Sequence, residues 1–224
     1  MAREGQRDVF LDLLRRFDRE GVLNQVMLIG SWCLALYRSA LSGATRLPAI
    51  RTLDADFLIP NQGLITRDVN VPSLLEQMGF VSTFVGSSGW VVYDHPELRV
   101  EFLVPERGRG SDQAHDVRKL HVTAQGLRYL NLLAQHPRQL SYEGLSVCVP
   151  EPAAYALQKL IVSARRTKAE KRQKDLEAAV AVLGYLESHP QEQDKMKDIL
   201  RSLPKGWLKT LNGLAKQHHL SLPV

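Results

Sequence analysis

The strongest constraint on the fold is the apolar run at residues 53–59, which two carboxylates interrupt. Side chains at positions i and i+2 of a strand point to the same face, so Asp54 and Asp56 are expected on one face of a strand. Two like charges a few ångströms apart repel, and burying either one is costly. The pair therefore predicts either a bound divalent cation or an edge strand whose acidic face is open to solvent.

Two further features surround this acidic pair. Gly30 and Ser31 follow a short apolar run and precede an apolar helical pattern, and a turn between a strand and a helix can cradle phosphate with its backbone N–H groups. Glu101 interrupts a second strand-like run at residues 98–104. Turns at residues 86–89 and 94–97 predict a meander that could bring Glu101 beside the aspartates.

A Gly-Ser turn, an Asp-x-Asp strand and one acid on a later strand resemble the DNA polymerase β-like nucleotidyltransferase superfamily. The resemblance covers most of residues 22–180. It is closest to stand-alone bacterial nucleotidyltransferase-fold proteins, including abortive-infection-type toxins. The sequence departs from the pattern at residues 42–51, which lengthen the connection between the turn and the aspartates and are expected to form a loop.

The resemblance also implies the roles of these residues. Asp54, Asp56 and Glu101 would be the catalytic acids and would bind two Mg²⁺ or Mn²⁺ ions. Gly30 and Ser31 would hold the β- and γ-phosphates of a nucleoside triphosphate, ATP among the possible donors.

The charge distribution predicts a boundary near residue 150. Residues 1–150 hold 16 Lys and Arg and 16 Asp and Glu, whereas residues 151–224 hold 13 and 8, a net charge of +5. We therefore expect a nucleotidyltransferase core at 1–150 and a helical domain at 151–224.

The helical part contributes three candidate lysines. A helix that begins Pro-x-x-Tyr-x-x-x-Lys, followed by a basic run and Lys-Asp, is similar to the C-terminal segment of bacterial stand-alone nucleotidyltransferases. By that similarity Lys159, Lys168 and Lys174 would bind the triphosphate, and Asp175 would orient one of them. The alternative is a solvated basic helix face.

The predicted fold class is α/β, a mixed sheet with helices followed by a C-terminal helical bundle. Helices are expected over 5–20, 31–41, 72–78, 151–161 and 191–217, the last one broken at 203–206, and an apolar helical stripe follows Asp175 at Leu176, Ala179, Val180, Leu183 and Leu186. Strands are expected over 25–29, 53–59, 80–85, 90–93, 98–104, 129–133 and 145–149. Residues 107–118 are polar and Gly-rich and are expected to form a loop.

Other patterns exclude whole classes of protein. No run of 18 apolar residues occurs, so we expect no membrane span, and a charged N-terminus argues against a secretory signal and for a cytoplasmic protein. Cys33 and Cys148 have no metal-ligand spacing, which predicts two buried free thiols.

Together these features predict a metal-dependent nucleotidyltransferase. It would move a nucleoside monophosphate from a triphosphate to a hydroxyl acceptor and release pyrophosphate. Two alternatives stay open: an inactive module of the same fold that binds nucleotide or RNA, and a toxin–antitoxin-type interaction protein. The acceptor could be RNA, which the basic charge favours, a protein or a small molecule. The preferred triphosphate, a protein partner and the oligomeric state are equally open.

Overall fold

The computed structural model describes residues 4–49, 52–106 and 113–223, and the chain forms two compact units. The first comprises residues 1–40 and 49–150, and the second comprises residues 41–48 and 151–224. The division after Pro150 falls where the charge balance changes, whereas the sequence did not predict that residues 41–48 belong with the C-terminal part. That 1–150 and 151–224 are separate domains stays a proposal.

The first unit contains four α-helices and nine strands in its described residues. The helices are α1 (Glu4–Arg19), α2 (Trp32–Ala40), α3 (Val71–Gln77) and α4 (Leu130–Ala134). The strands are β1 (Met27–Ile29), β2 (Asp54–Leu58), β3 (Val81–Val85), β4 (Trp90–His95), β5 (Leu98–Pro105), β6 (His115–Val117), β7 (Val122–Leu127), β8 (Pro137–Tyr142) and β9 (Leu145–Pro150).

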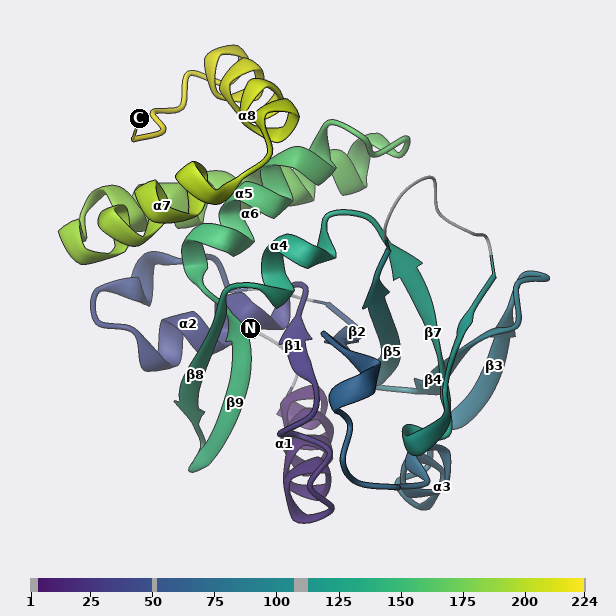
Figure 1. Cartoon of the computed structure of the whole chain (residues 1–224). Helices are drawn as coiled ribbons and strands as arrows, with labels where there is room; N and C mark the ends of the chain where they lie inside the picture. The colour runs from purple at the N-terminus through teal and green to yellow at the C-terminus, as the bar shows by residue number, and fades with distance from the viewer. Residues whose placement is uncertain (1–3, 50–51, 107–112, 224) are drawn as a thin grey trace. The chain divides into compact units, whose positions relative to one another are not determined.

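Seven of these strands form one mixed sheet, as predicted. The order is β1-β2-β5-β4-β3, with β7 beside β5 and β6 beside β7 (Figure 1). Strands β2, β5 and β7 run parallel, and the other pairs are antiparallel. The alternative that the acidic strand lies at an edge is wrong, because β2 lies between β1 and β5.

Helix α1 covers the apolar face of β2 and β5. The ring of Phe17 lies 5.2 Å from that of Phe57, which lies 6.0 Å from that of Phe102 (centroid distances). Trp32 of α2 stacks on Phe10 of α1 with ring centroids 3.7 Å apart and is buried, so this tryptophan is a core residue. The predicted helix at residues 5–20 is confirmed, and its apolar stripe is the side that packs on the sheet.

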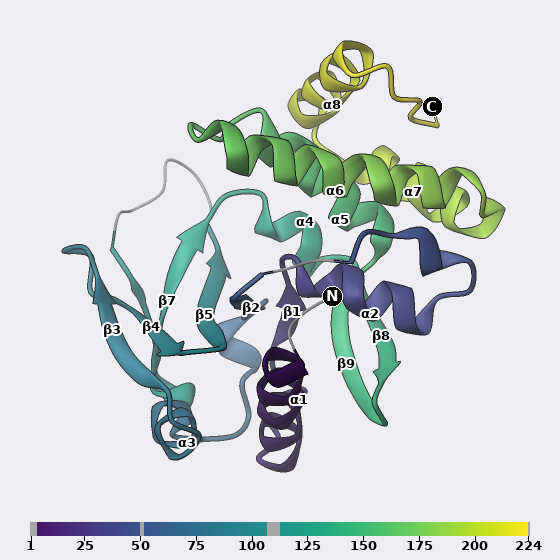
Figure 2. The same cartoon turned by 180° about the vertical axis from the view of Figure 1, so that it is seen from behind.

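Strands β8 and β9 form a separate antiparallel hairpin, seen from behind in Figure 2. The strand predicted at 129–133 is wrong, because these residues lead into the short helix α4 after Tyr129, whose φ is 69°. Strands β6, β7 and β8 were not predicted. Within the predicted loop 107–118, residues 107–112 lie outside the described part of the chain, and 115–117 form β6 instead of a loop.

The second unit is helical, as predicted. It contains α5 (Pro152–Ser163), α6 (Ala169–Glu187), α7 (Pro190–Ser202) and α8 (Lys205–Gln217), with a short 3₁₀ turn at Ala44–Arg46. Helices α6, α7 and α8 all contact α5, which is therefore the centre of the bundle. The predicted stripe on α6 fails at Val180, which is 41% exposed, whereas Ala178 is buried in its place. No helix in the described ranges is long and apolar enough to cross a membrane.

Candidate active site

The turn after β1 and the second aspartate of β2 are in direct contact. Gly30 has a φ of +72°, and a Cβ built on it would lie 2.0 Å from Oδ2 of Asp56. The register of the two strands explains this approach, because Ile29 pairs with Asp56. Only glycine meets both requirements, since other residues rarely adopt this φ and have no room for a side chain here. The long connection at residues 42–51 therefore does not separate the turn from the acids.

The third acid lies beside the second. In the parallel register of β2 and β5, Asp56 pairs with Glu101 and Asp54 pairs with Arg99. Paired residues on adjacent strands point to the same face, so the sheet places all four side chains on one face. Asp54 is exposed, and Asp56 and Glu101 are half-buried. The polar face is therefore accessible and sits opposite the aromatic core.

A positive charge shares this face. Nε of Arg99 donates to Oδ1 of Asp94 at 2.6 Å, and Asp94 on β4 pairs with Arg99 in the sheet register. The hydrogen bond to Asp94 raises the pKa of Arg99, and the charges of Glu101 and Asp54 raise it further. Arg99 thus offsets part of the repulsion among the carboxylates, a role that the sequence had assigned to a bound cation alone.

Sequence reasoning missed both Arg99 and Asp94. Arg99 precedes Glu101 by two residues on one strand, and the i, i+2 rule that joined the two aspartates would have placed it on the acidic face. Asp94 was assigned to a turn, whereas it lies within β4. Its place beside Arg99 could therefore be predicted only from the pairing of β4 with β5.

The side chains of the candidate acids are of the chemical type that binds divalent cations. Carboxylate oxygens are hard ligands that suit Mg²⁺ and Mn²⁺, and Mg²⁺ is often held by only one or two of them. Asp56 and Glu101, neighbours across β2 and β5, are the pair that would hold it, and Gly30 places no side chain against the Asp56 carboxylate. Across residues 4–49, 52–106 and 113–223, no three His, Cys, Asp or Glu side chains are grouped closely enough to hold a metal ion.

Ser31 lies between Gly30 and the first residue of α2. The amide of Leu34 donates to the carbonyl of Ser31 at 3.2 Å, which closes the first turn of that helix. The amide of Cys33 likewise donates to the carbonyl of Gly30 at 3.4 Å. The N-terminus of α2 carries the positive end of the helix dipole, an environment that favours a phosphate. No acidic residue lies in the first turn of α2 to compete for it.

A hollow of about 320 Å³ in this unit lies elsewhere on the sheet. It is lined by Ile59, Pro60, Asn61, Gln62, Val104, Pro105, His115 and Asn131. Ile59 and Pro60 follow the carboxyl end of β2, and Val104 and Pro105 end β5, whereas Asp54 begins β2. The hollow does not include the candidate acids.

The candidate lysines belong to the second unit, and Lys159 differs from the other two. Its Nζ donates to Oδ1 of Asp175 at 2.6 Å and lies 5.8 Å from the ring centroid of Tyr155. Nε of Arg166 donates to the other carboxylate oxygen at 2.8 Å. Burial raises the pKa of the Asp175 carboxyl, but the two cations lower it by more, so its pKa lies below the ordinary value.

Lys168 and Lys174 are exposed near the start of α6. Among the residues that the structure describes, neither has an ion-pair partner. The structure therefore brings Lys159, Asp175 and Arg166 together, and it leaves Lys168 and Lys174 on the surface of the helical unit.

The Gly-Ser turn lies against the Asp-x-Asp strand, and a further acid lies on the adjacent parallel strand of a mixed sheet, which is the arrangement that the resemblance to nucleotidyltransferases predicts. The sequence profile of the family described as Nucleotidyltransferase matches residues 9–203. The chain therefore belongs to this family of enzymes, which transfer nucleotidyl groups. No curated protein sequence matches it.

Solved structures show loose similarity to the whole chain. A nucleotidyltransferase-like antigenic protein from Paracoccidioides brasiliensis is 14% identical, with a TM-score of 0.45 and coverage of 95% of this chain and 94% of that one. The antibiotic-resistance factor ANT(2'')-Ia is 11% identical, with a TM-score of 0.49 and coverage of 98% and 99%. Because these overlaps are loose, the assignment to the family rests on the profile match.

Proposed function

We propose that the chain transfers a nucleoside monophosphate from a nucleoside triphosphate to a hydroxyl group at the face formed by Gly30, Asp54, Asp56 and Glu101. The acceptor oxygen bonds to the α-phosphorus, the bond to the β-phosphate oxygen breaks, and pyrophosphate leaves. The observation that carries this proposal is the contact of the Gly30 backbone with Asp56, with Glu101 as the next side chain across the sheet.

Each residue has a role that follows from its chemistry. Ser31 and the positive N-terminus of α2 bind phosphate oxygens, and Glu101 accepts the proton of the attacking hydroxyl. Asp56 and Glu101 would hold Mg²⁺ or Mn²⁺, with Asp54 as a further carboxylate on the same face. A divalent cation there would offset the negative charge of the triphosphate and of the leaving pyrophosphate. The expected count of two ions stays a prediction.

We also propose that lysines of the helical unit take part in binding the triphosphate. Asp175 holds Lys159 in one position, so this side chain loses little conformational freedom when an anion binds. Lys168 and Lys174 are exposed, and no ion pair within the described residues holds either of them. In this proposal Lys159 binds the triphosphate from a fixed position, whereas Lys168 and Lys174 can change conformation to reach it.

The acceptor remains the open part of the proposal. RNA, a protein hydroxyl and a small molecule are all compatible with a half-buried face of carboxylates. We favour RNA because the net charge of +5 lies in residues 151–224. The resemblance to abortive-infection-type toxins and a protein partner also stay predictions.

The test is a transfer assay with nucleoside triphosphates labelled at the α-phosphate or, separately, at the γ-phosphate. With Mg²⁺ or Mn²⁺ and total RNA, label should pass to the acceptor from the α-position only. Asp56→Asn should reduce transfer by about 100-fold or more while the protein stays folded. The matched control is Asp116→Asn, which removes the same charge from a carboxylate that is 68% exposed on β6.

Two results would contradict the proposal. One is transfer by Asp56→Asn at nearly the wild-type rate. The other is transfer of the γ-label, which would identify a phosphotransferase instead of a nucleotidyltransferase.

A further inference from the structure

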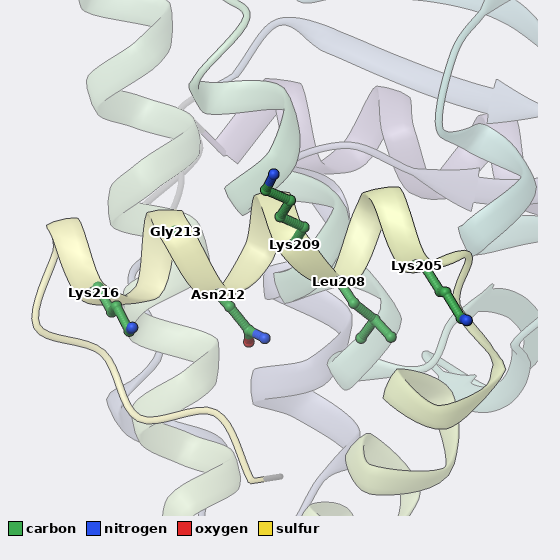
Figure 3. A pocket seen from close by; sticks show the side chains of 6 residues that line it. All are labelled: Lys205, Leu208, Lys209, Asn212, Gly213 and Lys216. Atoms are coloured by element: carbon green, nitrogen blue, oxygen red, sulfur yellow. The ribbon is translucent and has the colours of Figure 1, made fainter.

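Helix α8 divides its residues between two faces. Leu211, Leu214 and Ala215 are buried against the bundle. The exposed side carries a stripe of positions with the helical spacing i, i+4, i+7 and i+11, formed by Lys205, Lys209, Asn212 and Lys216. In Figure 3 the side chain of Lys209 extends to one edge of this stripe and those of the other three extend to its other edge. We call these four residues the lysine stripe. Together with Leu208 and Gly213 they line a hollow of about 580 Å³.

The lysines of this stripe are not neutralised. In the described residues none of the three has an ion-pair partner, and residues 203–224 contain no Asp or Glu. The preceding helix behaves differently, because on α7 Lys197 pairs with Asp194 at 2.8 Å and Arg201 with Asp198 at 3.1 Å. The stripe is therefore a concentrated positive charge, whereas the basic residues of α7 are locally balanced.

Helix α8 contains two exposed glycines, of which Gly213 lines the hollow with the lysine stripe. Gly206 and Gly213 are exposed, and a Cβ built on either one would meet nothing within 4 Å. Glycine in a helix is less stable than alanine, and here no packing within the described chain requires it. A glycine at position 213 is explained if an extended ligand approaches the helix backbone there, because a side chain would block that approach.

We propose that the lysine stripe of α8 binds the phosphate backbone of a nucleic acid. Eleven helical steps from Lys205 to Lys216 span about 16 Å, the length of about five phosphates along one strand. A membrane surface is a poor match, because a helix that lies on a bilayer needs an apolar face free for lipid and that of α8 is buried. The stripe carries no aromatic side chain for base stacking, so binding should not depend on sequence.

This surface does not depend on the transfer reaction, so its test uses the full chain without nucleotide or metal. The probe is a fluorescein-labelled oligouridylate of about 12 nucleotides, with anisotropy measured between about 50 and 200 mM salt. Wild type should bind, with affinity falling steeply as salt rises. Lys209→Gln/Lys216→Gln should bind at least about 10-fold more weakly and lower the salt slope by about 1.4, or 0.7 for each lost phosphate contact.

The matched control changes the same charge on the neighbouring helix. Lys197→Gln/Arg201→Gln should bind as the wild type does, because those side chains are already paired. Equal weakening by both double variants would overturn the proposal, since only net charge would then matter. Absence of binding by the wild type at about 50 mM salt would overturn it too, as would equally effective competition by polyglutamate, which would indicate an acidic protein partner.

The glycines provide a second, opposite readout. Gly213→Ala should raise the melting temperature by about 2 °C and yet weaken oligonucleotide binding, because the added methyl group occupies the approach path. Gly184→Ala on α6, where a Cβ also meets nothing within 4 Å, should give a similar thermal shift with unchanged binding. Unchanged binding by Gly213→Ala would remove the close-approach part of the proposal.

Discussion

The backbone of Gly30 lies against the carboxylate of Asp56, close enough that a Cβ would meet Oδ2 at 2.0 Å. This contact joins the Gly30-Ser31 turn to the acidic strand across a chain separation of 26 positions. It also explains how a long intervening connection is tolerated, because the antiparallel pairing of β1 with β2 fixes the approach. The candidate site therefore depends on strand register more than on the connecting loop.

Substituting Gly30 by alanine should be much more damaging than the same change at another left-handed glycine. Gly144 in the β8–β9 turn has a φ of +82° with nothing near its missing Cβ, so Gly144→Ala isolates the backbone strain, about 1–2 kcal/mol. Gly30→Ala adds a collision with Asp56 and should cost about 1–3 kcal/mol more in urea unfolding, with loss of transfer. Equal destabilisation by the two variants would show that the contact with Asp56 is unimportant.

Removing the positive charge beside the acids should strengthen metal binding. Arg99→Gln leaves Asp54 and Glu101 without the cation that offsets them, so the affinity for Mn²⁺, measured by electron paramagnetic resonance, should rise about 3- to 10-fold. Asp94→Asn keeps Arg99 but frees it from its ion pair, and it should leave Mn²⁺ affinity unchanged or weaken it. If Arg99→Gln binds Mn²⁺ no better than the wild type, Arg99 does not compete with the metal.

The ion pairs of Asp175 should stabilise the helical unit in a pH-dependent way. Since Asp175 has a lowered folded-state pKa, its contribution is present above the unfolded value of about 3.9 and is lost as the pH falls through the folded value. Asp175→Asn leaves the mostly buried Lys159 without its carboxylate and should cost about 3 kcal/mol at pH 7.

The control for this substitution is Asp198→Asn, which breaks a pair with both side chains about three-quarters exposed. It should change the free energy of unfolding by about 0.5 kcal/mol or less. If Asp175→Asn is equally mild at pH 7, or if its effect persists unchanged below pH 3, the stabilising role of the pair is wrong.

The thiol of Cys148 should be slow to react in the folded protein. Burial raises the pKa of Cys148 to about 11, so only about 0.1% is thiolate at pH 8. Alkylation by iodoacetamide, followed by mass spectrometry, should accelerate about tenfold per pH unit between pH 8 and 10. Modification at pH 8 as fast as in urea would show that Cys148 is accessible and not shifted.

The sequence predicted the centre of the sheet well because its signals are local. The turns at residues 86–89 and 94–97 defined the meander, and the i, i+2 spacing placed Asp54 and Asp56 on one face. Whether the acidic strand lies at the edge or in the interior of the sheet depends on which strands pair with β2. Those partners are distant in the sequence, so the alternative of an edge strand could be excluded only from the fold.

The failures have physical causes too. Residues 129–133 form a short apolar run, and such runs fit a buried helix or a buried strand equally well until the left-handed Tyr129 shows where the helix begins. Strand β7 contains Gly126 and two polar residues, Thr123 and Gln125, so its sequence alone favours a strand only weakly. Pairing with β5 stabilises it as a strand. Arg99 differs, because its place on the acidic face follows from its i, i+2 spacing to Glu101 alone.

The most direct test of the central claim needs no acceptor. Each of the four nucleoside triphosphates is titrated with Mg²⁺ into the wild type, Asp54→Ala/Asp56→Ala and the control Asp116→Ala by calorimetry. The account predicts metal-dependent binding of at least one triphosphate to the wild type and the control, and its loss in the double variant. Binding that is undiminished in the double variant would contradict the account, as would no binding of any triphosphate to the wild type.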